Sequence, residues 1–181
     1  MLCKTCAAND SNLTEKQFHE KYDIDPDEIG YAGKGDNGTA YHVSNDRILK
    51  ITRSKPEWDL AKELLGRSHE FSNFVEYYAA EIVDGDYYIL MEEISADDSE
   101  IEDLFGQAQE YLIDGPAYPD HFDPDDFEDV NPYVIDFIDE LCNVVYDYRK
   151  LGVFNPDIRA ENLGRDSAGT LKAFDIFNRS N

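Results

Sequence analysis

The middle of this chain contains no positively charged side chain other than histidine. Between Arg67 and Arg149 there is no lysine or arginine, while residues 68–148 carry 24 of the 40 aspartates and glutamates. Acidic and basic residues balance in the remainder, so this section accounts for the whole net charge of −24. Such a field repels phosphates, and we expect no direct binding of nucleic acid. It attracts cations, such as a basic protein surface, a polyamine-like substrate or a divalent metal, unless it serves only solubility.

Cysteines and long apolar runs are also scarce. Three cysteines are an odd count for a disulfide framework. Cys3 and Cys6 form a CxxC pair without a second ligand pair nearby, which favours reduced thiols in an unstructured end over a zinc or redox site. Cys142 lies in an apolar helical stretch and is expected in the core. No run approaches the ~20 apolar residues of a membrane span, and residues 1–12 lack a signal peptide's apolar stretch. We therefore expect no membrane association and a cytoplasmic location, in the protein's own cell or a host's.

The chain nevertheless has the composition of a folded protein. Its 181 residues are 41% hydrophobic and include 12 tyrosines and 10 phenylalanines, enough for a buried core in one domain of two small lobes. Alternating apolar residues predict five strands, with one helix between the third and the fourth. The expected elements are a helix over 14–21, two strands flanking 33–38, a strand over 47–52, a helix from Pro56, a hairpin over 74–91 turning at Asp84-Gly85, helices over 100–112 and 132–151, and a loop over 114–132.

A glycine cluster, Gly33-Lys34-Gly35-Asp36-Asn37-Gly38, separates the first two strands. Gly33, Gly35 and Gly38 would let a turn lie close over phosphates, whose oxygens the backbone N–H groups can bind. A dinucleotide-binding unit needs a helix directly after its glycines, whereas a strand follows here. The cluster also lacks the Gly-Lys-Ser/Thr ending of a P-loop. Glycine hairpins without a ligand are common, so the cluster gains weight only from its neighbours.

Lys50 lies in the apolar strand Ile48-Leu49-Lys50-Ile51, 12 residues after the glycine cluster. A lysine there points either to solvent or into a site as a partner of phosphate. An acidic helix follows and favours the second interpretation. Glu63, about two turns inside that helix, is the expected partner of Lys50, and Glu57 is the alternative. Either glutamate could instead belong to a solvated helix face.

The densest polar cluster is Asp157-Ile158-Arg159-Ala160-Glu161-Asn162, which follows an apolar lead-in. A carboxylate at Asp157 could orient an attacking hydroxyl and take its proton, and an amide oxygen at Asn162 could hold magnesium. Asp175 follows 13 residues later, after the turn 166–169 and the apolar run 171–174. A hairpin there would return Asp175 to the side of Asn162. An isolated D-x-x-x-x-N is more often a capped turn, but these surroundings favour a site.

The order and spacing of these clusters resemble the signature pattern of the protein-kinase-like superfamily over roughly residues 29–178. The resemblance implies an α+β fold: a five-stranded antiparallel amino-terminal lobe with one helix, and a reduced, mainly helical carboxy-terminal lobe. It divides the chain into a lead-in over 1–28, an amino lobe over 29–94 and an acidic carboxy lobe over 95–181. The cofactors it implies are ATP and Mg²⁺.

The same resemblance assigns roles to individual residues. Gly33, Gly35 and Gly38 would cover the phosphates, and Lys50, paired with Glu63, would contact them. Asp157 would be the catalytic aspartate, with Arg159 near the transferred phosphate. Asn162 and Asp175 would be the metal ligands. Met91 would border the adenine pocket, and the backbone of Glu92 to Ile94 would meet the adenine edge.

The sequence departs from the kinase pattern at three places. Asn155-Pro156 replaces His-Arg before the aspartate, and Asp175-Ile176-Phe177 replaces Asp-Phe-Gly. Only six residues follow Asp175, so we expect neither an activation segment nor the later helices that bind peptide substrates. A core this short is similar to the compact kinases of bacteriophages and to short kinase effectors of enteric bacteria.

Three functions follow from these observations. The first is a minimal Mg-ATP-dependent kinase that phosphorylates Ser or Thr of a protein substrate. The second is a pseudokinase whose acidic section, 95–132, captures a basic partner protein. The third is a small-molecule kinase of the antibiotic-phosphotransferase type, in which an acidic pocket receives a cationic substrate.

Overall fold

The computed structural model describes residues 12–35, 37–43, 46–95, 99–114, 129–152 and 158–174. The chain divides into two compact units. The first takes in the described residues up to Leu65 together with Tyr77–Glu92, and the second takes in Gly66–Glu76 and the described residues from Glu93 onward. The expected α+β class is confirmed. The expected boundary at 94/95 lies two residues from the division between Glu92 and Glu93, but the segment 66–76 joins the second unit.

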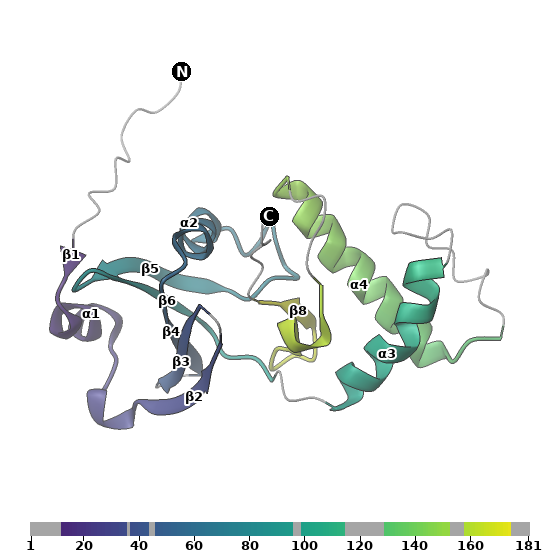
Figure 1. The fold of residues 1–181 in the computed structure, drawn as a ribbon, viewed down its shortest axis with the longest axis horizontal. Helices are drawn as coiled ribbons and strands as arrows, with labels where there is room; N and C mark the ends of the chain where they lie inside the picture. The colour runs from purple at the N-terminus through teal and green to yellow at the C-terminus, as the bar shows by residue number, and fades with distance from the viewer. Residues whose placement is uncertain are drawn as a thin grey trace, which may run out of the picture. The chain divides into compact units, whose positions relative to one another are not determined.

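The first unit is built on a six-stranded sheet in the order β1-β5-β6-β4-β3-β2 (Figure 1). Its strands are β1 (Asn12–Leu13), β2 (Gly30–Lys34), β3 (Gly38–Val43), β4 (Arg47–Thr52), β5 (Tyr77–Val83) and β6 (Asp86–Glu92). Strands β2 to β6 are antiparallel neighbours, as expected. The prediction of a five-stranded antiparallel sheet is nevertheless wrong, because β1 adds a sixth, parallel edge strand beside β5.

The β5–β6 hairpin forms where the Asp84-Gly85 pair predicted it. Both turn residues have positive φ, 50° at Asp84 and 95° at Gly85. This is the combination that a tight two-residue hairpin turn requires and that Asp-Gly adopts at low cost. The hairpin is the longest in the sheet, with pairs from Tyr77↔Met91 to Val83↔Asp86.

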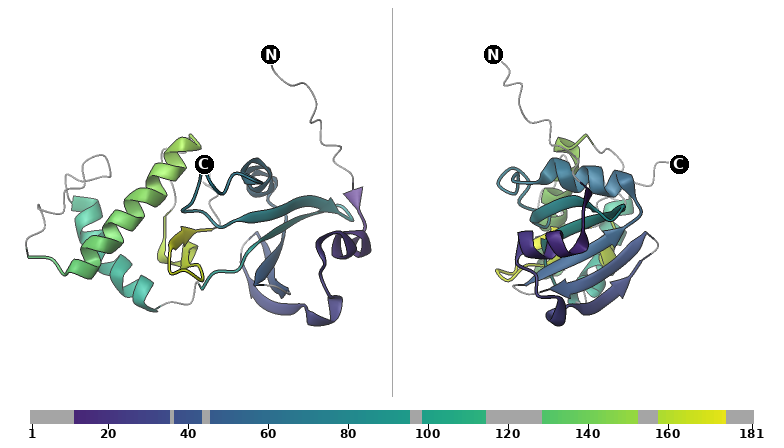
Figure 2. Two further views of the ribbon diagram at one scale, coloured as in Figure 1. Left: turned by 180° about the vertical axis from the view of Figure 1, so that it is seen from behind. Right: turned by 90° about the vertical axis from the view of Figure 1, so that its left-hand side faces the viewer.

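Helices α1 (Glu15–Tyr22) and α2 (Lys55–Leu64) cover opposite faces of this sheet. Phe18 of α1 is fully buried in a cluster with Leu49 and Leu90. Trp58 of α2 instead contacts Tyr87, whose side chain alternates to the other face, with ring centroids 5.3 Å apart. The right-hand view of Figure 2 looks at this unit from the end where α1 lies.

The helix α1 begins at a capping box. The Thr14 hydroxyl accepts a hydrogen bond from the Gln17 N–H, and the Gln17 side chain accepts one from the Thr14 N–H. Its residues were assigned to a lead-in that precedes the amino lobe, but Phe18 has no exposed surface. Helix α1 is therefore part of the core of the first unit.

Replacing Phe18 by alanine is expected to lower the free energy of unfolding by about 3–5 kcal/mol, because it empties a fully buried aromatic site. Urea unfolding followed by circular dichroism measures the change. Gln17→Ala, on the exposed side of the same helix, is a control for local helix effects and should cost less than about 2 kcal/mol. Equal losses in the two variants would mean that burial of the Phe18 ring adds no stability beyond that of the helix itself.

The second unit contains two long helices and a short hairpin. Helix α3 (Ser99–Asp114) and helix α4 (Pro132–Lys150) pack against each other (Figure 1). Every residue of the predicted α4 stripe is buried: Val134, Phe137, Ile138, Leu141, Val145 and Tyr148. The strands β7 (Leu163–Arg165) and β8 (Leu171–Ala173) form the hairpin. Most of the predicted loop over 114–132 lies outside the described residues.

The segment 66–76 is fastened to the second unit by polar and aromatic contacts. Asp147 of α4, buried at 2% exposure, accepts hydrogen bonds from the N–H and the side chain of Asn73. Phe74 packs edge-on against Tyr148 with ring centroids 4.9 Å apart. The Val75 N–H donates to the carbonyl of Ala173 over 3.1 Å. In the described parts of the chain, no helix is both long and apolar enough to cross a membrane.

Candidate functional site

The glycine cluster forms the turn between β2 and β3. The Gly35 N–H donates to the carbonyl of Gly38 over 3.0 Å, which closes the turn. The carbonyl of Asn37 accepts a hydrogen bond of 2.9 Å from the Arg53 N–H, just beyond the end of β4. The tip of the hairpin is thereby tied to the strand that carries Lys50.

The three glycines of the turn differ in what surrounds them. A Cβ added to Gly38 would lie 2.3 Å from the carbonyl oxygen of Ile51, so close packing of β3 on β4 requires glycine there. A Cβ at Gly33 or Gly35 would meet nothing within 4 Å, and neither residue has a positive φ. Neither backbone conformation nor packing within the protein requires glycine at these two positions. The open space beside them is available to a ligand.

Lys50 does not point to solvent. It sits between Leu49 and Ile51, and alternation along β4 turns it away from the cluster that buries Leu49. Its ammonium forms an ion pair with the carboxylate of Glu57 in α2. The two side chains are only 13% and 8% exposed, so this is a buried pair rather than a surface contact.

Glu57 is also held by its neighbours in the chain. Its Oε2 lies 2.8 Å from the hydroxyl of Thr52, and its N–H donates to the Ser54 hydroxyl, which caps α2. The Thr52 hydroxyl also lies 3.1 Å from the carbonyl of Asn37, so the two acceptors compete for its single proton. Thr52 thus connects the glycine turn to the carboxylate that meets Lys50.

The expected partner of Lys50, Glu63, lies elsewhere on the helix. Its side chain is exposed, whereas Glu57 in the first turn is buried. Only two residues separate β4 from α2, so the first turn of the helix is held beside the strand. The structure pairs Lys50 with Glu57, the alternative, and a role for Glu63 stays a prediction. The shortness of this connection is visible in the sequence and could have pointed to Glu57 in the first turn of the helix. The role of Thr52 had no such signal.

The residues expected beside adenine fall on both sides of the division between the units. Met91 is buried in β6 opposite Ile48. Glu92 ends that strand. Ile94, in the second unit, lies against Gly164, where an added Cβ would come 2.7 Å from the Ile94 Cδ1. The segment expected as a hinge therefore contains the point at which one unit ends and the other begins.

Arg159 and Asn162 lie at the entrance to the β7–β8 hairpin. Arg159 precedes the short helix η3 (Ala160–Asn162) and is exposed, with its guanidinium 3.4 Å from the carboxylate of Glu161. The carbonyl of Asn162 accepts a hydrogen bond of 3.0 Å from the Phe174 N–H. The predicted hairpin is confirmed, and it returns the chain to Asn162 one residue before Asp175. Asp157 and Asp175 themselves lie outside the described residues.

The hairpin turn is fixed by the carboxylate of Asp166. Partial burial alone would raise the pKa of this group, but hydrogen bonds from the N–H groups of Thr170 and Ala168 and the ammonium of Lys172 outweigh burial and lower it. Arg165 forms two 3.0 Å hydrogen bonds with the carboxylate of Glu140 in α4. The segment that carries Asn162 is therefore anchored within the second unit.

Only some of the cysteine and metal predictions concern residues that the structure describes. Cys142 is half-buried rather than fully in the core, and burial, with a smaller contribution from Asp139, raises the pKa of its thiol to about 11. Cys3 and Cys6 lie outside the described residues. Within the described ranges, no group of three or more His, Cys, Asp and Glu side chains could hold a metal ion. The predicted magnesium pair of Asn162 and Asp175 is not tested by this, since Asp175 is not described.

These features define two separate groups of candidate residues: the glycine turn with Lys50 and Glu57 in the first unit, and the loop around Asn162 in the second. Comparison with known proteins adds no family to this description, because the sequence matches no family model and no similar sequence is found among curated proteins.

Proposed function

We propose that this protein is a minimal kinase of the protein-kinase-like superfamily, acting in the cytoplasm of its own cell or a host's. It uses Mg-ATP to phosphorylate Ser or Thr of a protein. The observation that carries the proposal is the buried Lys50–Glu57 ion pair beside the glycine turn. A lysine taken out of water and held by a carboxylate is positioned to meet a second anion, such as a phosphate, at little further entropic cost.

The first unit offers groups suited to the triphosphate. The space beside Gly33 and Gly35 is open to phosphate oxygens, and the ammonium of Lys50 would contact the α- and β-phosphates. Thr52 would keep Glu57 in place behind that ammonium. The backbone of Glu92 to Ile94 would meet the adenine edge, and Met91 would border the ring.

The second unit offers the groups for phosphoryl transfer. Asp157 would orient the substrate hydroxyl and accept its proton, and Arg159 would lie near the transferred phosphate. Asn162 and Asp175 would hold Mg²⁺, which neutralises charge on the phosphates when bound. The hydrogen bond between Phe174 and Asn162 supports this pairing, because it brings the two segments together.

A pseudokinase that captures a basic partner is the second candidate. Exposed carboxylates of Glu100, Glu102 and Asp103 begin α3, and no basic residue lies in the last turn of that helix. On this alternative, capture would weaken steeply with salt and survive Lys50→Ala. A small-molecule kinase that accepts a cationic substrate is a third candidate, which ATP turnover with aminoglycosides would reveal.

The kinase proposal is tested by incubating the protein with Mg²⁺ and γ-labelled ATP, alone and with bacterial and eukaryotic lysates. We expect labelled protein with the wild type and none with Asp157→Asn. Asp103→Asn, which removes the same charge from an exposed position on α3, is the matched control and should label as the wild type does. Label that persists in Asp157→Asn would refute the assignment, and ATP binding without label would favour the pseudokinase.

A further inference from the structure

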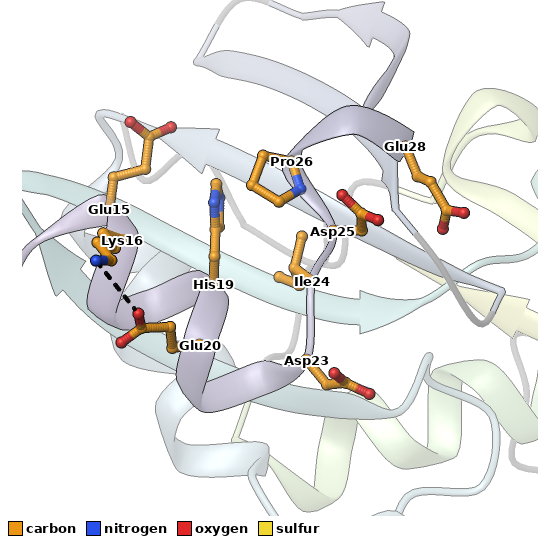
Figure 3. A pocket seen from close by; sticks show the side chains of 9 residues that line it. All are labelled: Glu15, Lys16, His19, Glu20, Asp23, Ile24, Asp25, Pro26 and Glu28. Atoms are coloured by element: carbon orange, nitrogen blue, oxygen red, sulfur yellow. Dashed lines mark ion pairs between the residues drawn. The ribbon is translucent and has the colours of Figure 1, made fainter.

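The first unit has a hollow that the proposed kinase site does not use. It lies between α1 and the short helix η1 (Pro26–Glu28) and has a volume of about 720 Å³ (Figure 3). Pockets that bind small ligands cover a similar range of volumes. Nine residues line it: Glu15, Lys16, His19, Glu20, Asp23, Ile24, Asp25, Pro26 and Glu28.

The lining of this hollow is strongly negative. Five of its nine residues are acidic, against one lysine. That lysine, Lys16, is exposed and pairs with Glu20 over 3.6 Å, so it offsets only one of the carboxylates (Figure 3). One oxygen of Asp25 accepts the Asp27 N–H within η1, and the negative charge of Asp25 remains. The hollow therefore favours a cation.

His19 supplies a second, independent sign of a ligand. Its side chain belongs to α1 and is more than nine-tenths buried, at 8% exposure. Its Nε2 is fully buried and has no hydrogen-bond partner among the described residues. Figure 3 shows its ring projecting from α1 into the space between the helix and the segment that carries Ile24 and Pro26. A buried polar atom without a partner costs about 1–3 kcal/mol, which a bound donor would recover.

We propose that this hollow binds an organic cation with a primary ammonium group, either a free polyamine or a lysine side chain of another protein. An N–H of the ligand would donate to Nε2 of His19, the carboxylates at the rim would balance its charge, and Ile24 and Pro26 would contact its methylene groups. A metal ion fits less well, because within the described residues no three ligating side chains converge. The inference does not depend on the kinase proposal.

The test uses the full chain and two probes, spermidine and a lysine-containing peptide, titrated by calorimetry at 150 mM salt. The variant Glu15→Gln/Glu20→Gln/Glu28→Gln neutralises exposed residues of the hollow. Glu76→Gln/Asp136→Asn/Asp139→Asn removes the same charge from exposed positions in the second unit. We expect the first variant to weaken binding at least about tenfold and the second to change it less than about twofold.

NMR of the histidine imidazoles distinguishes binding in this hollow from nonspecific attraction of a cation to the negatively charged protein. Ligand binding should shift the ring signals of His19 and leave those of His69, which belongs to the second unit, unchanged. Binding of spermidine alone identifies a free amine, and binding of the peptide alone identifies a partner's lysine. The proposal fails if neither probe binds, if the two triple variants lose affinity equally, or if the His19 signals do not move.

Discussion

Replacing Lys50 by methionine is expected to lower kcat/KM for phosphoryl transfer by about 10²–10³-fold. Methionine keeps the length and apolar stem of lysine but removes the ammonium that would meet the phosphates. Glu57 is then left as a buried carboxylate without its cation, which costs stability as well. Kinetics should therefore be measured well below the unfolding temperature of the variant, with folding checked by circular dichroism.

Two glutamates of the same helix provide a matched test of the partner of Lys50. Glu57→Gln removes the buried carboxylate and should reduce kcat/KM by about 10²-fold. Glu63→Gln makes the same chemical change at an exposed position and should stay within about twofold of the wild type. A larger loss in Glu63→Gln would restore Glu63 as the partner. Full activity in both glutamine variants and in Lys50→Met would show that catalysis does not require the ion pair.

Replacing Gly38 by alanine is expected to lower the free energy of unfolding by about 3 kcal/mol or more. The new Cβ would lie 2.3 Å from the carbonyl oxygen of Ile51 and 3.0 Å from the Cα of Thr52. Both atoms belong to the backbone of a central strand, so neither can move without disturbing the sheet. Urea unfolding followed by fluorescence of Trp58 measures the loss, since Trp58 is the only tryptophan.

The other two glycines of the turn are the controls. Gly33→Ala and Gly35→Ala place a methyl group in open space and should each change stability by less than about 0.5 kcal/mol. If that space receives the phosphates, both substitutions should still weaken ATP binding, which is measurable with a fluorescent ATP analogue. Three equal losses of stability would contradict the packing difference, and unchanged ATP affinity would argue against a phosphate site there.

Local patterns predicted the secondary structure well. The helix over 132–151 followed from apolar residues at helical spacing, and every residue of its expected stripe is buried. Asp84-Gly85 predicted a hairpin because these residues tolerate the positive φ of its turn. Such features depend only on neighbours in the chain, so the sequence contains them directly.

Contacts between distant segments were harder to predict. The strand β1 is only two residues long and carries no periodicity, so its parallel pairing with β5 had no local signal. The burial of Phe18 against Leu49 and Leu90 likewise depends on how α1 folds onto the sheet. The resemblance therefore placed α1 outside the amino lobe, although its Phe18 lies in the core of the first unit.

The sequence by itself determined the order of the elements, the location of the negative charge and the residue types available for chemistry. The tertiary structure decided which of those residues meet. It paired Lys50 with Glu57 because a two-residue connection holds the first turn of α2 beside β4. It also buried His19 beside an acidic hollow, and it showed that only Gly38 of the three glycines is required by packing. Each of these outcomes depends on side-chain direction and strand register, which are fixed only when the sheet and its helices are assembled.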